Sequence, residues 1–254
     1  MKTDMKKLTG LLCTMALLCG AATLHPAQAQ IALGETGITL TTTPALATDY
    51  LFRGISQTRN RPAAQLTLDA QHESGLYLGA FASNVAFPGS NARQEVDFLA
   101  GYRFQAGAAS LDLGGIYYTY PGYDAPPGGY SYDYFEVMAK GAYTLDRVKF
   151  VGTAAWSPDF YSEAGDAFYL EAGADVSLPA AFTLAGRWGH QWIDRNPRYG
   201  APDYSTWSIA LSREVVAGFL LSVGYYDTSL SKADCFGGTK LCEARALVML
   251  SRPF

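Results

Sequence analysis

The chain has 254 residues, of which 49% are hydrophobic, 13% aromatic and 17% charged, and its formal net charge is −4. Because acidic side chains outnumber basic ones, the composition argues against a protein that binds nucleic acid through a basic surface. Beyond the first 29 residues, no run reaches the roughly 18 apolar residues that a membrane-spanning helix needs.

The first 29 residues have the pattern of a secretory signal peptide. A basic segment, MKTDMKK, precedes the apolar LTGLLCTMALLCGAATL, and the small residues Ala27 and Ala29 permit cleavage after them. A lipoprotein would require Cys13 or Cys19 to follow a small residue, but leucine precedes each of them. We therefore predict export and cleavage of residues 1–29, which leaves 16 Lys and Arg against 22 Asp and Glu.

Beyond this leader, apolar and polar residues alternate with a period of two, which is typical of β-strands with unlike faces. In FTLAGRWGHQW, Phe182, Leu184 and Trp188 share one face, and Arg187 and Gln191 share the other. Twelve such segments are predicted, each close to the roughly 9 to 11 residues that a tilted strand needs to cross a bilayer. They cover residues 43–53, 63–72, 76–86, 94–104, 110–120, 132–143, 148–157, 167–178, 182–192, 204–213, 219–227 and 243–254.

The connections between these segments fall into two classes that alternate along the chain. Tight turns such as ESG, TLDR and LPAA alternate with longer polar loops such as GISQTRNRP, PGYDAPPGGYSYD and TSLSKADCFGGTKLC. Short turns at one end and long loops at the other are typical of outer-membrane barrels. We therefore predict an all-β, transmembrane antiparallel β-barrel over residues 43–254, after a periplasmic segment at residues 30–42, in a Gram-negative outer membrane.

One face of the predicted strands is apolar and the other is charged, and an exported barrel is expected to turn its apolar face to lipid. The charged face then lines the interior, where opposed charges could select solutes. Twelve strands lie between about eight, whose side chains just fill the interior, and the 16 to 18 of general porins. The predicted pore-lining residues are Asp49, Arg53, Asp69, Glu95, Asp97, Arg103, Asp112, Glu136, Lys140, Lys149, Glu171, Asp175, Arg187 and Arg245.

Arg53 and Asp49 are four residues apart on the first predicted strand, and therefore share its inward face near the outer mouth. Together with Arg59 and Arg61 in the following loop, Arg53 could attract anionic solutes into the entrance. Alternatively, Arg53 only pairs with Asp49 or with a loop carbonyl. Both interpretations are compatible with the sequence.

Two cysteines follow the leader, and both lie in one loop, DCFGGTKLC. In an exported protein, Cys235 and Cys242 are expected to form a disulfide, because no histidine or further cysteine lies nearby to complete a metal site. The acidic loops SPDFYSEAGD and PGYDAPPGGYSYD lack the ordered ligand spacing of a calcium loop. No metal and no cofactor are therefore expected.

Catalysis is disfavoured because the chain beyond the leader has only two histidines, His72 and His190. His190 shares the lipid face of its strand with Trp188 and Trp192, whereas Ser208 on the next strand faces the lumen. A nucleophile and a base are therefore not placed together. We predict that the protein is not an enzyme.

The sequence ends in ALVMLSRPF, with Phe254 in phase with Leu250 and Val248. The last strand must pair with the first one, because an open edge in hydrocarbon would leave unpaired backbone groups at several kcal/mol each. An aromatic residue in this phase resembles the signal that the barrel-assembly machinery recognises. Arg252 departs from that pattern, since an apolar or aromatic residue is usual there.

The run ALATDYLFRGISQTRNRPAAQ at residues 45–65, with ESGLYLGAFASNV, GIYYTYPGY, AAWSPDFY and VGYYDTSL, resembles the TorF-type porin family of proteobacteria, formerly conserved proteins of unknown function. The resemblance covers nearly the whole mature chain. It implies an outer-membrane barrel that forms a channel, but it implies neither a particular solute nor particular site residues.

The expected function is passive diffusion of small polar or charged solutes through a narrow, mixed-charge lumen. The alternative is a closed barrel that serves as a scaffold or as a surface-binding module through its extracellular loops. The expected partners are outer-membrane lipid and the assembly machinery, and no oligomeric state is predicted.

Overall fold

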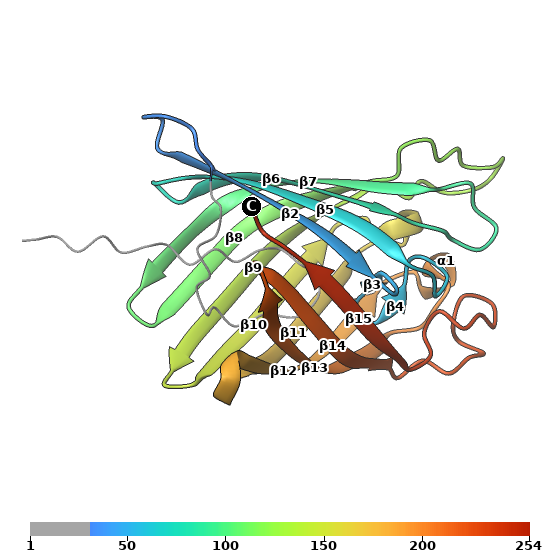
Figure 1. Cartoon of the computed structure of the whole chain (residues 1–254). Helices are drawn as coiled ribbons and strands as arrows, with labels where there is room; N and C mark the ends of the chain where they lie inside the picture. Colours follow the sequence, from blue (N-terminus) through green and yellow to red (C-terminus); the bar gives the residue numbers. More distant parts are fainter. Residues whose placement is uncertain (1–30) are drawn as a thin grey trace, which may run out of the picture.

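The computed structural model describes residues 31–254, so the predicted signal peptide at residues 1–29 lies outside the described part of the chain. Twelve antiparallel strands form a closed barrel (Figure 1), as the sequence predicts. They are β2 (Ile38–Ala47), β5 (Ala63–His72), β6 (Leu76–Asn84), β7 (Gln94–Ala106), β8 (Ala109–Thr119), β9 (Tyr134–Leu145), β10 (Val148–Ser157), β11 (Ala167–Ser177), β12 (Phe182–Ile193), β13 (Tyr204–Val216), β14 (Phe219–Thr228) and β15 (Arg245–Ser251).

The barrel closes between its last strand and its first. Each wall strand pairs with its neighbours along the chain, and β15 returns to pair with β2, where Ser251 opposes Ala45. Beyond β15, Phe254 donates a backbone hydrogen bond to Thr42 and accepts one from it, at 2.8 and 2.9 Å. The predicted pairing of the last strand with the first is confirmed, and the residues up to Phe254 extend this seam.

The period-two alternation separates the two faces of the wall. Leu78, Phe98 and Trp188 point outward and are 67%, 56% and 52% exposed. Their inward-pointing neighbours Tyr77 and Asp97 are buried. An apolar exterior over a polar interior is the arrangement of a transmembrane barrel and the inverse of that in a water-soluble one.

The connections confirm the predicted sidedness. The five short turns lie at one end of the barrel, which we call the turn end, and one of them includes η2 (Pro179–Ala181). The long loops gather at the opposite end, the loop end (Figure 1). They carry η1 (Tyr161–Glu163) and α1 (Asn196–Tyr199). No helix within residues 31–254 is both long enough and apolar enough to cross a membrane.

The first strand differs from the prediction. It begins at Ile38, inside the segment predicted to be periplasmic, where β1 (Ile31–Ala32) pairs with it, and it ends at Ala47 rather than at residue 53. Residues 48–53 alternate as a wall strand would, but they enter the barrel. There β3 (Leu51–Phe52) and β4 (Ile55–Ser56) form a separate small sheet. Alternation of apolar and polar residues with a period of two indicates that the two faces of a strand have different surroundings. It does not indicate whether either face contacts lipid.

Candidate functional site

The long connection between β2 and β5, residues 48–62, folds back into the barrel. We call this segment the inner hairpin. Arg53 and Gly54 form its two-residue turn, with φ angles of 48° and 83°. Positive φ at both positions is the requirement of a type I′ turn, which matches the twist of the two strands that it joins.

Gly54 shows how closely the hairpin tip approaches the barrel wall. A Cβ atom on Gly54 would lie 2.5 Å from Oγ1 of Thr206 on β13 and 2.7 Å from Cγ2 of Thr228 on β14. A side chain at this position would therefore clash with the wall as well as strain the turn. The hairpin tip therefore lies against β13 and β14, which are three and two strand positions from β2 around the barrel.

The side chain of Arg53 ties the tip to two further wall strands. Its Nη2 atom donates to both carboxylate oxygens of Glu136 on β9, at 2.9 and 2.8 Å, and Nη1 donates to Oε1 of Gln191 on β12, at 2.6 Å. The guanidinium carbon lies 4.3 Å from the ring centre of Tyr169 and 5.8 Å from that of Phe160. All of these groups are buried, so the ion pair is shielded from solvent.

The base of the inner hairpin is anchored by separate contacts. The hydroxyl of Tyr50 donates to Glu95 at 2.6 Å. One carboxylate oxygen of Asp49 accepts hydrogen bonds from Ser56 and Thr58, and the other accepts one from Arg245 on β15, at 2.7 Å. The hairpin is thus held at its base as well as at its tip.

The loop between β14 and β15 packs against the same base, and its predicted disulfide between Cys235 and Cys242 is confirmed. The carbonyl of Leu241, next to the second cysteine, accepts hydrogen bonds from the backbone N–H of Ser56 and from the Arg245 guanidinium, at 2.9 and 2.6 Å. The disulfide-closed loop therefore restrains the strand of the hairpin that returns to the wall.

Aromatic side chains fill the loop end around the hairpin. Tyr118 and Tyr134 stack with ring centres 4.3 Å apart, and Phe160 packs between Tyr134 and Tyr199. Burial raises the pKa of Tyr199 to about 12, so this phenol stays neutral at physiological pH. The loop-end half of the lumen is consequently packed with aromatic side chains. Its charged groups are the ion pairs of the hairpin and the carboxyl groups beside them.

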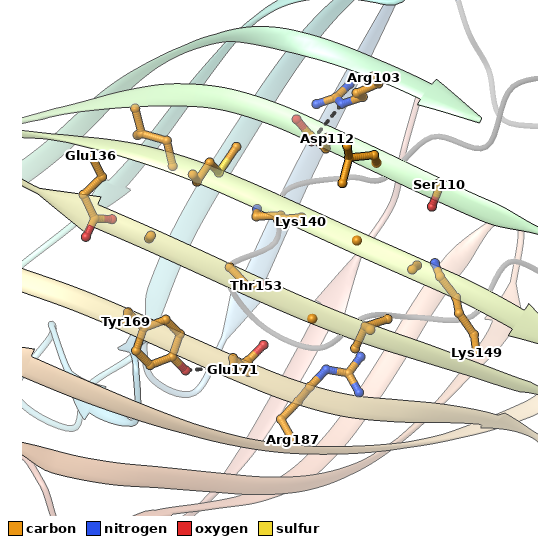
Figure 2. Close-up of a pocket in the computed structure, with 18 of the residues that line it drawn as sticks. Arg103, Ser110, Asp112, Glu136, Lys140, Lys149, Thr153, Tyr169, Glu171 and Arg187 are labelled. Carbon is orange, nitrogen blue, oxygen red and sulfur yellow. Dashed lines mark hydrogen bonds and ion pairs between the residues drawn. The ribbon is translucent and has the colours of Figure 1, made fainter. Parts of the chain in front are cut away.

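The turn-end half encloses a cavity of about 440 Å³. Its lining runs from Arg53 and Gly54 at the hairpin tip to residues 73–75 in the first short turn, and includes no residue from the five other long loops of the described chain. Figure 2 shows Arg103, Lys140 and Arg187 among the charged side chains that surround it. The cavity thus lies on the turn side of the hairpin and ends at its tip.

Arg103 and Arg187 of the cavity wall are paired with acids on the next strand or on the one beyond it. Arg103 on β7 contacts Asp69 on β5 at 2.9 Å and Asp112 on β8 at 3.2 Å (Figure 2 marks the second pair). Arg187 on β12 pairs with Asp175 on β11. Positive and negative charges are therefore mixed in this half of the lumen.

All of the predicted pore-lining residues point into the barrel or belong to the inner hairpin. Those that line the cavity are Arg53, Arg103, Asp112, Glu136, Lys140, Lys149, Glu171 and Arg187. Those that are packed against other groups away from it are Asp49, Asp69, Glu95, Asp97, Asp175 and Arg245. That these side chains line a path for solutes stays a prediction.

The interpretation of Arg53 as a mouth residue on the first strand is wrong. Neither Arg53 nor Asp49 belongs to β2, and they do not pair with each other, because the turn carries Arg53 across the lumen to Glu136. Arg59 and Arg61 stay exposed at the loop end, apart from Arg53. Sequence reasoning missed the inner hairpin, although Arg-Gly between the apolar pair Leu51-Phe52 and Ile55 is compatible with a tight turn.

Two further polar features bear on chemistry. His190 lies on the outer face, and its Nδ1 atom forms a hydrogen bond of 2.9 Å with the hydroxyl of Ser205. Ser205, and not Ser208, is therefore the serine beside His190. No carboxylate in residues 31–254 holds the other ring nitrogen, as a catalytic triad requires. Within the same residues, no group of three or more His, Cys, Asp or Glu side chains could hold a metal ion.

Solved structures with a similar fold are outer-membrane porins and channels. The KdgM porin aligns with a TM-score of 0.57 and 10% identity, covering 84% of this chain and 99% of that one. The NanC porin aligns with a TM-score of 0.55 and 7% identity, covering 84% and 97%. An outer membrane channel from Pseudomonas putida F1 aligns with a TM-score of 0.50 and 12% identity, covering 91% and 100%. At these identities, the similarity establishes a shared porin-type barrel fold.

No curated protein matches the chain in sequence. A family model described as "Bacterial protein of unknown function (Gcw_chp)" matches residues 31–254, which is the whole described barrel. The match does not test the resemblance to TorF-type porins, which stays a prediction. The chain belongs to the Gcw_chp family of bacterial proteins.

Proposed function

We propose that this protein is an outer-membrane channel through which small polar or charged solutes diffuse passively. The observation that carries the proposal is the cavity of about 440 Å³ inside a closed barrel, with charged side chains in its wall. Such an interior suits water and ions, while the exposed apolar exterior suits lipid. In this orientation the loop end faces the outside of the cell and the turn end faces the periplasm.

The inner hairpin is then the constriction of the channel. The cavity reaches the hairpin tip from the turn end, and Arg53 bridges the remaining lumen to β9 and β12. Conduction therefore requires the tip to withdraw, and the channel alternates between a closed and an open population. A mixed-charge wall beyond the constriction lets solutes of either sign enter the cavity.

A closed barrel whose extracellular loops bind a partner is the second candidate. The aromatic packing around Tyr134 and Phe160 and the buried hairpin favour it, because both fill the loop-end half of the lumen. Under this alternative, the hairpin stabilises the barrel and never opens.

Export and assembly complete the proposal. The signal peptide at residues 1–29 would direct the chain across the inner membrane. The C-terminal residues, which continue the seam beyond β15 to Phe254 beside Thr42, would present the signal for the assembly machinery, and the protein would carry out no catalysis.

Conductance of the refolded barrel in planar bilayers tests the proposal. We expect discrete openings for the wild type, and larger or longer openings for a variant in which residues 49–60 are replaced by a short Gly-Ser linker. Circular dichroism and protease resistance serve to establish that both barrels are folded. If both folded proteins remain silent in several salts, the closed-barrel alternative replaces the channel.

A further inference from the structure

The groups that hold the Arg53 guanidinium belong mainly to the barrel wall and not to the hairpin that supplies it. Both carboxylate oxygens of Glu136 accept from Nη2, Oε1 of Gln191 accepts from Nη1, and the ring centre of Tyr169 lies 4.3 Å from the guanidinium carbon. A carboxylate that accepts two bonds, a further acceptor and an aromatic ring are the features by which proteins recognise a planar guanidinium. The wall therefore presents a site that is complementary to a guanidinium group.

The wall groups are held in place by contacts that do not involve Arg53. The hydroxyl of Tyr118 donates to Glu136 at 3.1 Å. The amide nitrogen of Gln191 donates to the carbonyls of Phe168 and Trp192, at 3.2 and 3.1 Å, which turns its oxygen toward the lumen. Because none of these bonds involves the hairpin, we expect the site to keep its shape when the tip withdraws.

The surroundings of the site favour a cation. Glu95 and Asp97 lie in the same half of the lumen as Glu136, and both are buried. Neither forms an ion pair within residues 31–254, and Oδ1 of Asp97 has no hydrogen-bond partner. The carboxylate of Glu136 supplies the negative charge of the site, which favours a cation there and disfavours an anion.

We propose that Glu136, Gln191, Tyr169 and Phe160 form a binding site for small organic cations that carry a guanidinium group, and that Arg53 occupies this site when the channel is closed. The inference rests on the proposed channel function and names its solute class. Arg53 and Glu136 both line the cavity, so a solute in the cavity reaches the site directly. A solute cation and the hairpin tip compete for one carboxylate, and binding of the solute therefore favours the open population.

Replacement of the tip side chain by free guanidinium tests the proposal. In planar bilayers, we expect Arg53→Ala to conduct more than the wild type, because the bridge across the lumen is lost. Addition of about 10 mM guanidinium chloride should lower the potassium current of this variant at least twofold by refilling the site. Equal concentrations of sodium chloride or tetramethylammonium chloride should not. The matched control, Arg53→Ala with Glu136→Gln, should lose the response to guanidinium.

The outcomes separate the inference from the function on which it rests. If Arg53→Ala conducts but guanidinium and sodium act alike, or if the control variant keeps the guanidinium response, the site is refuted and the channel stands. If no folded variant conducts, the channel itself is refuted. If Arg53→Ala does not fold, reversal potentials of the wild type test the proposal. A guanidinium chloride gradient should give a higher cation-to-anion permeability ratio than a sodium chloride gradient. An equal or lower ratio overturns the proposal.

Discussion

The two halves of the lumen use the same residue types for different purposes. At the turn end, Arg103 and Asp112 face each other across β7 and β8 in direct register, and their ion pair supports the wall around a cavity. At the loop end, Arg53 and Glu136 are 83 residues apart in the chain and hold an inserted segment against the wall. The first pair stabilises the wall itself, whereas the second fastens an inserted segment that is not part of the wall.

The consequences of losing a partner should therefore differ between the halves. Arg103 has a second acid, Asp69, so loss of Asp112 leaves its charge compensated. Arg53 relies on Glu136 as its acid partner, and a buried charge left without its partner costs about 3 to 5 kcal/mol. Four changes, three of them substitutions and one the reduction of the disulfide, test this difference in order of decreasing expected effect.

Gly54→Val should have the largest effect, because the added side chain meets Thr206 and Thr228 and the residue has a positive φ. We expect the hairpin tip to lose its contact with β13 and β14 and the conductance to rise several-fold. The free energy of unfolding should fall by about 3 kcal/mol or more. Bilayer recordings and thermal unfolding measure the two effects. Gly152→Ala on β10 is the control, since its Cβ would have only one neighbour, at 3.7 Å. Equal conductance and equal stability of the two variants would contradict the close contact between the hairpin tip and the wall.

Glu136→Gln should come next, because it preserves the shape of the site but leaves the Arg53 cation buried without a carboxylate. The expected loss of unfolding free energy is about 3 kcal/mol. Asp112→Asn, at the turn end, should lose only about 1 kcal/mol because Asp69 remains with Arg103. Chemical unfolding in detergent or lipid vesicles measures the unfolding free energies of both variants. A larger loss of unfolding free energy for Asp112→Asn than for Glu136→Gln would contradict the proposed distinction between the halves.

Reduction of the disulfide should act on the loop-end half alone. The bond between Cys235 and Cys242 closes a short loop, and a loop of this length stabilises the folded chain by about 2 to 3 kcal/mol. Because the loop anchors Ser56 in the inner hairpin, we expect more frequent channel openings after reduction. Recordings with and without a reductant measure the opening frequency, with the Cys235→Ser, Cys242→Ser variant as the control that should not respond. Unchanged openings would show that the loop does not restrain the hairpin.

Glu73→Gln should have the smallest effect, since Glu73 lies exposed in the first short turn, at the rim of the cavity. Its influence on stability should stay within about 0.5 kcal/mol. A shift in cation preference should appear at low ionic strength and vanish in about 1 M salt, where charges are screened within about 3 Å. Reversal potentials at the two salt concentrations measure this shift, and a shift that persists at high salt would argue against an exposed position.

Much of the wall could be predicted from the sequence. In β12, Arg187 and Gln191 alternate with Trp188 and Trp192, and the structure places the first pair inward and the second outward. Successive side chains of any strand point to opposite faces, so this alternation depends only on local backbone geometry. The inner hairpin escaped prediction for the same reason, since Tyr50 and Phe52 alternate like wall residues but are buried inside the barrel.

The sequence by itself determined the number of barrel strands, the alternation of turns and loops, the disulfide and the inward direction of most of the charges. These features depend on local backbone geometry, on turn chemistry and on the need to pair every backbone group in a closed sheet. Only the tertiary structure decided that residues 48–62 turn inward and that Arg53 meets Glu136 and Gln191. Contacts across a lumen depend on the closure of the whole barrel, and no local pattern in the chain encodes which strands face each other across it.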